Sequence, residues 1–343
     1  MSGNRSDDVE DPVEHFLQDI VYHGKSERTR AAYERVLRRF EHYLADTDSR
    51  DIGSASQRDC MAWIHELRGT ASTSTVATYA AYLHRFYGYM VQIGEFESNP
   101  MALVMEELDE TIDADPTRRD LSITDMRTFV AGISHPLERA VIVTLLKTGM
   151  RVGELCNLDR RDLNLKSNQL DSGPTEPRPA LQGKLNSIYV DDSPSRGTVH
   201  NGERRTASNK RMRETVVPVD QELARELTRW LAVRPDPRSS AGPLFSSTGD
   251  QWGARLTTDM AYHIVEEQAT DMGWHRAGGG PEENVTPHYF RHFFTTHLRD
   301  RTGDRGIVKY LRGDVASDVI DTYTHNWGDR VRKVYEANIY SLR

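Results

Sequence analysis

Apolar residues recur at helical spacing through the first third of the chain. Four successive stretches carry one apolar face each, beginning at Pro12, Ser26, Ser56 and Thr75. This spacing predicts four amphipathic helices that pack as a bundle. Gly24 follows the first stretch and Gly94 the last, where glycine most readily adopts the backbone conformation that ends a helix. We therefore expect a helical domain over 12–107, preceded by an acidic, disordered tail over 1–11.

The second helical stretch is rich in arginine around its apolar face. Its basic residues are Arg28, Arg30, Arg35, Arg38 and Arg39. One interpretation is a solvated basic face that Glu34 and Glu41 balance, and the other is a face that contacts phosphate.

The pattern changes after residue 107. The segment 108–120 is polar and lacks periodicity, which is typical of a linker between domains. Helical spacing then returns and is most apolar over 137–148, which indicates the core of a second domain over 121–343. Alternating residues over 187–190 and 214–219 predict two strands of a small antiparallel sheet, joined by a long polar loop.

Composition limits the class of protein. No stretch approaches the roughly 20 apolar residues of a membrane helix, and the acidic start differs from a signal peptide. Cys60 and Cys156 lie too far apart for a metal-ligand motif. We expect a reduced, cytoplasmic protein with no membrane partner. The formal net charge of −8 argues at first sight against a nucleic-acid partner, unless arginines line one groove while acidic residues cover the outer surface.

Candidate chemistry gathers near the C-terminus. His288 and Arg291 follow Pro287 and stand three residues apart, so they share one helical face on which both could bind a phosphate. Tyr323 follows a second apolar-periodic stretch and a glycine turn, which could return its hydroxyl toward the same point. Two cations facing a tyrosine hydroxyl suit attack on a phosphodiester.

Another arginine stands at a predicted turn. The stretch 148–155 reads Thr-Gly-Met-Arg-Val-Gly-Glu-Leu and predicts a turn followed by a helix start. Arg151 then lies where a helix N-terminus favours an anion, and Glu154 could hold it there. A purely structural role for Arg151 is the alternative.

These segments resemble the signatures of the tyrosine recombinases, the family of phage integrases and Xer recombinases. The family reads His-x-x-Arg-His, then Leu-Gly-His, then Tyr-Thr-His, where this chain has His288-Tyr289-Phe290-Arg291-His292, then Arg312-Gly313-Asp314, then Tyr323-Thr324-His325. The spacings from Arg291 to Asp314 and from Asp314 to Tyr323 are typical of the family. The stretch 148–155 is similar to the family's first arginine motif, and 12–107 resembles its SAM-like core-binding domain.

The resemblance implies a mainly α fold with a small antiparallel β-sheet. A SAM-like bundle and a catalytic domain with a C-terminal helix would close on DNA as a C-shaped clamp. The implied activity is site-specific recombination, as in an integrase or resolvase, through a 3′-phosphotyrosyl intermediate without metal, ATP or cofactor. The implied partners are double-stranded DNA and copies of the chain itself, as a tetramer in synapsis. Relatives exchange the C-terminal helix between protomers, and packing within one chain is the alternative.

The resemblance also implies roles for the catalytic residues. Tyr323 would be the nucleophile, and Arg151 and Arg291 would stabilise charge on the phosphorane. His288 would take the tyrosine proton or bind an oxygen. Lys210, placed eight residues before the proline of the second strand, would protonate the leaving 5′-oxygen. Four arginines crowd the same loop and leave a generic phosphate-binding patch as the alternative: Arg204, Arg205, Arg211 and Arg213.

Asp314 departs from the family, which has His or Trp at this catalytic position. An ionised carboxylate cannot donate a hydrogen bond to phosphate. Three accounts are open: Asp314 points away and orients Arg291 or His288, it is protonated, or the enzyme is weakened. The alternative function is accordingly a DNA-binding protein of the same fold with weak or lost cleavage, and a topoisomerase is a third candidate. The acidic balance resembles the haloarchaeal style, which predicts an archaeal-type variant.

Overall fold

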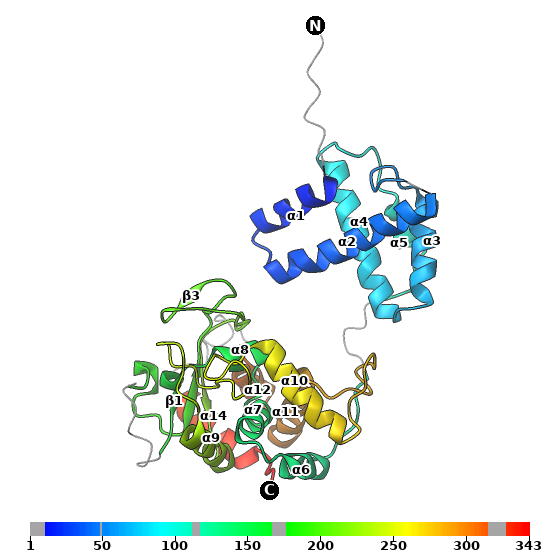
Figure 1. The fold of residues 1–343 in the computed structure, drawn as a ribbon. Helices are drawn as coiled ribbons and strands as arrows, with labels where there is room; N and C mark the ends of the chain where they lie inside the picture. The colour runs from blue at the N-terminus through cyan, green and yellow to red at the C-terminus, as the bar shows by residue number, and fades with distance from the viewer. Residues whose placement is uncertain (1–10, 49, 112–116, 167–175, 315–326) are drawn as a thin grey trace. The chain divides into compact units, whose positions relative to one another are not determined.

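The computed structural model describes residues 11–48, 50–111, 117–166, 176–314 and 327–343. The chain divides into two compact units, Met1–Pro116 and Thr117–Arg343 (Figure 1). The division falls inside the segment 108–120 that the sequence predicts as a linker. Each unit has its own apolar core, as expected for chains of this length.

Within the described residues, the N-terminal unit is a bundle of five helices. They are α1 (Pro12–Tyr22), α2 (Glu27–Asp48), α3 (Gln57–Arg68), α4 (Thr73–Gln92) and α5 (Met101–Glu106). The first four match the predicted stretches, and the short α5 was not predicted. Phe16, Phe40 and Trp63 are buried in the core of the bundle. Asp11, predicted at the end of the disordered tail, instead caps α1 by accepting hydrogen bonds from two main-chain amides of its first turn.

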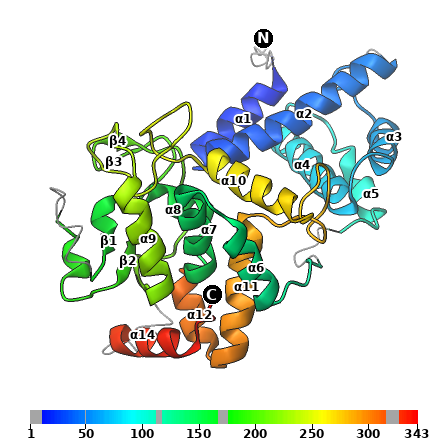
Figure 2. The ribbon, with the colours of Figure 1, turned by 60° about the horizontal axis from the view of Figure 1, so that its bottom comes forward.

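The second unit is built around one apolar helix. Its helices are α6 (Ile123–Gly132), α7 (Pro136–Thr148), α8 (Val152–Asn157), α9 (Gln221–Val233), α10 (Thr258–Asp271), α11 (Pro287–Thr302), α12 (Arg305–Arg312) and α14 (Trp327–Asn338). Helix α7 is buried along most of its length and packs against α9 and α11 (Figure 2). Among the described residues, no helix has the length and apolar content needed to cross a membrane.

Short strands flank this helical core. The predicted sheet is antiparallel and has three strands in the order β1 (Leu163–Asn164), β2 (Ser187–Val190) and β5 (Thr215–Pro218). The segment between β2 and β5 forms a separate hairpin of β3 (Val199–His200) and β4 (Glu203–Arg204). Its two turn residues, Asn201 and Gly202, both have positive φ angles, as a tight hairpin turn requires.

The C-terminal segment packs against its own chain. Tyr335 of α14 and Tyr340, which follows the end of the helix at Asn338, donate hydrogen bonds to the main-chain carbonyls of Lys147 and Leu146 in α7. Lys147 of α7 is fully buried, with its Nζ 2.6 Å from Asp220 and 2.7 Å from Glu222. The carbonyl of Tyr340 accepts a third hydrogen bond from Lys147. Within this one chain, the ion cluster holds the residues after α14 against α7, and exchange of the C-terminal helix between protomers stays a prediction.

Candidate active site

A glycine turn positions the first predicted arginine. Helix α7 ends at Gly149, whose φ of 61° is left-handed, and a Cβ there would lie 2.2 Å from the ring of Phe294. Only glycine fits such a position. Two residues later Arg151 is the N-cap of α8, and its main-chain amide donates to the carboxylate of the fully buried Glu154. The turn and the cap together direct the side chain of Arg151 toward α12.

The second predicted arginine lies one turn inside α11. Thr286 caps this helix and Pro287 occupies its first turn, as the sequence predicts. Arg291 is only 3% exposed, and its Nη1 donates to the carbonyls of Gly149 at 2.7 Å and Arg312 at 3.1 Å. Main-chain carbonyls from two other segments therefore hold this guanidinium group in place.

The two arginines converge on a single anionic group, the carboxylate of Asp314. Oδ1 of Asp314 accepts from Nη2 of Arg151 at 2.8 Å and from Nη2 of Arg291 at 2.7 Å. The two Nη2 atoms can therefore lie no further apart than the sum of these distances. A third guanidinium joins them through an ion pair without a hydrogen bond, because Nε of Arg312 lies 2.9 Å from Oδ2 of the same carboxylate. Nothing in the residue pattern indicates this role for Arg312, which has the position of an ordinary basic residue at a helix end.

The carboxylate is ionised at neutral pH. Burial acts to raise the pKa of Asp314, but the charges of Arg291, Arg312 and Arg151 outweigh it and lower the pKa below its ordinary value. The lowered pKa favours the ionised form and argues against the account in which Asp314 is protonated. Burial and the neighbouring Arg151 lower the pKa of Arg291 to about 10, which still leaves the guanidinium charged.

The loop that carries Lys210 connects both arginine segments. The carbonyl of Lys210 accepts a hydrogen bond from Nη1 of Arg151 at 3.2 Å, while the lysine itself is exposed. Arg211 next to it is buried and donates to Glu154 at 3.1 Å and to the carbonyl of Leu311 at 3.2 Å. Arg211 is thus a structural anchor rather than part of a phosphate-binding patch.

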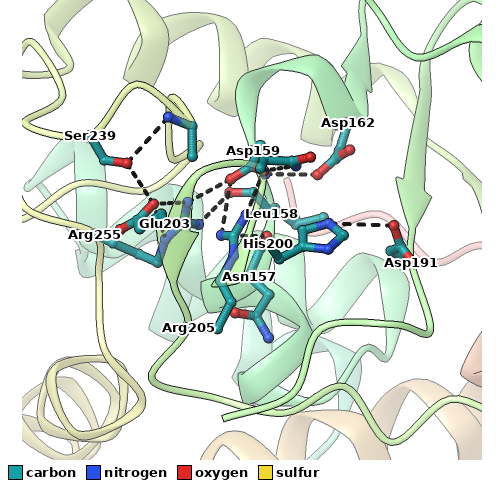
Figure 3. Close-up of polar contacts among 12 residues, drawn as sticks. Asn157, Leu158, Asp159, Asp162, Asp191, His200, Glu203, Arg205, Ser239 and Arg255 are labelled. Carbon is teal, nitrogen blue, oxygen red and sulfur yellow. Dashed lines mark hydrogen bonds and ion pairs between the residues drawn. The ribbon is translucent and has the colours of Figure 1, made fainter. Parts of the chain in front are cut away.

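A buried ion network holds Arg205, which lies earlier in the same segment between β2 and β5 (Figure 3). The carboxylate of Asp159 accepts from Arg205 at 2.7 Å and from Arg255 at 2.6 Å. Arg255 also pairs with Glu203 of the β3–β4 hairpin at 2.6 Å. The side chains of Asp159 and Arg205 are completely buried. Sequence reasoning missed the network, because its partners come from three separate segments and no motif joins them.

His288 lies on the exposed side of α11, one turn before Arg291. Partial desolvation and the positive charges of Arg118, Arg291 and Arg312 lower the pKa of His288 below its ordinary value. The imidazole is therefore neutral at pH 7. It borders a cavity of about 270 Å³ that Arg118 and the glycine-rich loop at Gly280 also line.

The structure brings Arg151, Arg291, Asp314 and the Lys210 main chain into contact, with His288 close enough for its charge environment to be set by the same arginines. Tyr323 lies outside the described residues. The arrangement supplies fixed hydrogen-bond donors to one anion, which is what a phosphoryl-transfer site requires.

Comparisons with known proteins agree with this geometry. Residues 13–94 match the phage integrase N-terminal SAM-like domain, and residues 183–328 match the phage integrase family. The tyrosine recombinase XerD of Listeria innocua is 26% identical over 338 residues, which cover 96% of this chain and 97% of that protein. XerD of Shewanella oneidensis is 24% identical over 340 residues and covers 95% of each.

Solved structures share the fold. The Tn1549 transposon integrase in complex with transposon right end DNA has a TM-score of 0.63 at 19% identity, covering 95% of this chain and 98% of its own. A lambda integrase dimer bound to a COC′ core site has a TM-score of 0.61 at 12% identity, covering 89% and 94%. The family matches, the relatives over nearly the full length and the converging arginines agree with one another. The chain therefore belongs to the tyrosine recombinases, the phage integrase family.

Proposed function

We propose that this protein is a site-specific DNA recombinase that cleaves and rejoins DNA through a 3′-phosphotyrosyl intermediate on Tyr323. The observation that carries the proposal is the convergence of the Nη2 groups of Arg151 and Arg291 on one oxygen of a single anion. Such a pair of fixed donors suits the two non-bridging oxygens of a phosphodiester. Because the phosphodiester energy is retained in the covalent link, rejoining needs no ATP.

The surrounding residues support specific roles. Arg151 and Arg291 stabilise the charge that develops on the phosphorane, since their guanidinium groups are already oriented before the reaction. His288, which is neutral at pH 7, accepts the proton of the tyrosine hydroxyl. Lys210 protonates the leaving 5′-oxygen, a task for which arginine holds its proton too firmly.

The proposed substrate is double-stranded DNA at a specific site, on which copies of the chain assemble. Structures with the same fold include an integrase tetramer bound to a Holliday junction, which supports a tetramer in synapsis. Closure of the two units around the duplex as a clamp is part of the same proposal. The cytoplasm is the proposed location, and the net charge of −8 supports a salt-rich cytoplasm of the archaeal type.

The test is covalent trapping on DNA that the protein itself selects. Sites are recovered from a randomised duplex library by repeated binding. The recovered duplex is then nicked next to the cleaved position, so that the short fragment released by cleavage diffuses away and cannot be rejoined. Wild-type protein should form a protein–DNA adduct that survives denaturation. Tyr323→Phe should bind the same duplex and form none, while Tyr262→Phe, which changes an exposed tyrosine of α10, should behave as wild type.

A second candidate is a DNA-binding protein of the same fold with weak or lost cleavage. It is favoured by one observation, the carboxylate that occupies the arginine pair. Specific binding of the selected duplex with no adduct from wild-type protein would establish this candidate. An adduct that persists in Tyr323→Phe would instead assign the nucleophile to another residue.

A further inference from the structure

Three guanidinium groups share one carboxylate at the predicted active site. Arg151, Arg291 and Arg312 each place a nitrogen within 2.9 Å of an oxygen of Asp314. Three like charges at this separation repel one another strongly unless an anion lies between them. Asp314 is that anion in the DNA-free protein, and it contacts the same Nη2 groups that the proposed mechanism assigns to the phosphate.

The two arginines of the motif do not depend on Asp314 for their positions. Nη1 of Arg291 is fixed by the carbonyls of Gly149 and Arg312. Nη1 of Arg151 is fixed by Glu154 and the carbonyl of Lys210, both at 3.2 Å. Each guanidinium therefore has one amino group anchored in the protein and the other directed at the shared anion. If the carboxylate left, the two Nη2 groups would remain in place.

The main chain next to Asp314 is also fixed. Gly313 has a left-handed φ of 72°, and a Cβ there would lie 2.7 Å from the side chain of Arg211. The carbonyl of Gly313 accepts from the amide of Met212 at 3.1 Å, and the amide of Asp314 donates to the carbonyl of Lys309 at 3.1 Å. The side chain of Asp314, which is 24% exposed, can thus rotate toward solvent without a shift of the main chain up to that residue.

We propose that Asp314 is an internal placeholder for the scissile phosphate, and that Arg312 is a third phosphate-binding residue of the site. A phosphodiester and an ionised carboxylate cannot bind to the same three guanidinium groups at the same time, so the phosphate binds by displacing the carboxylate. The incoming phosphate then meets Nη2 of Arg151 and Arg291 together with the guanidinium of Arg312. Arg312 in this way supplies the donor that an aspartate at position 314 cannot. The inference rests on the proposed function, because it names further parts of the same phosphate site.

The first experiment measures a small anion, so that it does not depend on cleavage or on the DNA site. Dimethyl phosphate, a diester with a single charge, is titrated into the full chain by calorimetry. Asp314→Asn keeps the shape of the side chain and removes the competing charge, and it should bind dimethyl phosphate on the order of tenfold more tightly than wild type. Asp300→Asn, an equal change of charge at the far end of α11, is the matched control and should leave the affinity unchanged.

The second part tests Arg312. In the Asp314→Asn background, Arg312→Met should remove most of the gain in affinity. Arg305→Met, at the other end of α12, should retain it, and Arg312→Lys should restore part of it because a lysine still carries the charge. The thermal unfolding midpoint of each variant is recorded, and affinities are compared only among variants that are folded at the assay temperature.

Unchanged or weaker binding of dimethyl phosphate by folded Asp314→Asn would overturn the placeholder. A gain that survives Arg312→Met would overturn the third phosphate-binding residue. Should Asp314→Asn fail to fold, the anion is titrated into Asp314→Ser, for which the same tightening is expected and the same absence of it contradicts the proposal. These outcomes are separate from the proposed function: a protein that binds the anion as expected yet forms no adduct would retain the three-arginine site and lose the assignment as a recombinase.

Discussion

Arginines gather in two regions of this chain and are held there in opposite ways. On α2 they pair with carboxylates at the surface: Arg30 with Glu14 and Glu34, and Arg38 with Asp11 and Glu41. In the catalytic unit they are buried and bound to main-chain carbonyls or to buried acids, as Arg291 is to the carbonyl of Gly149.

The difference lies in how easily the partner can be exchanged. A surface carboxylate is mobile and solvated, so an incoming phosphate can replace it at little cost. A main-chain carbonyl cannot rotate away, and it fixes one face of the guanidinium while the other face stays available. Residue type alone does not show which of the two kinds of partner an arginine has. Helix α2 has features of both interpretations. Arg30 and Arg38 form ion pairs with carboxylates, whereas Arg28 and Arg35 are exposed.

The largest effect is expected where an anchored arginine is replaced by lysine. Arg291→Lys should slow adduct formation on the nicked duplex by about 10²–10³-fold, the usual result of removing one fixed donor from a transition state. A single ammonium group cannot bond both carbonyls and the phosphate. Arg38→Lys on α2 should change the rate only a few-fold. Equal effects of the two variants would erase the distinction between the regions.

Stability should follow the same division. Arg205→Met leaves Asp159 fully buried with one of its two arginines removed, and we expect the free energy of unfolding of the catalytic unit to fall by about 3 kcal/mol. Arg38→Met breaks surface pairs and should cost about 1 kcal/mol or less. Scanning calorimetry of the full chain measures both. A larger loss for Arg38→Met would mean that the α2 pairs are structural.

Glycine substitutions probe the turn that anchors Arg291. Gly149→Ala adds a Cβ that would lie 2.2 Å from Phe294 in a left-handed conformation, whereas Gly24→Ala meets no atom within 4 Å at a similar φ. The left-handed conformation alone costs about 1–2 kcal/mol, and the clash adds about 1–2 kcal/mol for Gly149→Ala. Urea unfolding of the two variants compares them. If they are equally stable, the ring of Phe294 moves aside freely and the turn is not rigid.

Helical spacing predicted most of the fold because each helix buries one apolar face. It located the four helices of the N-terminal bundle and the strands β2 and β5 to within a few residues. Helices α9 and α10 were absent from the prediction, although Leu223, Leu227 and Trp230 recur at helical spacing behind the cap at Asp220. The prediction for this region rested on the charged residues of the loop before α9 and not on the apolar spacing after it.

The sequence predicted which residues form the site, but not which of them contact one another. Motif spacing singled out Arg151, Arg291 and Asp314, which do converge, but it left open whether Asp314 points away from the phosphate position. The contacts between charged side chains depend on how segments far apart in the sequence pack together. The role of Arg312 therefore could not be predicted from its residue type. Tyr323 lies outside the described residues, and its role as nucleophile stays a prediction.

The smallest expected effect concerns the histidine beside the arginine cluster. Desolvation and the charges of Arg118, Arg291 and Arg312 lower the pKa of His288 below its ordinary value of 6.5. His288 is therefore half protonated only at a pH below 6.5, and the neutral form predominates at pH 6.5 and above. Adduct formation should stay constant from pH 8 down to 6.5 and decline below that, and His288→Gln should be slower and lack this acidic decline. His263→Gln on α10 should keep it. A rate that rises on acidification would make the imidazolium the active form, so that His288 would act with the anchored arginines as a fourth cation rather than as the base.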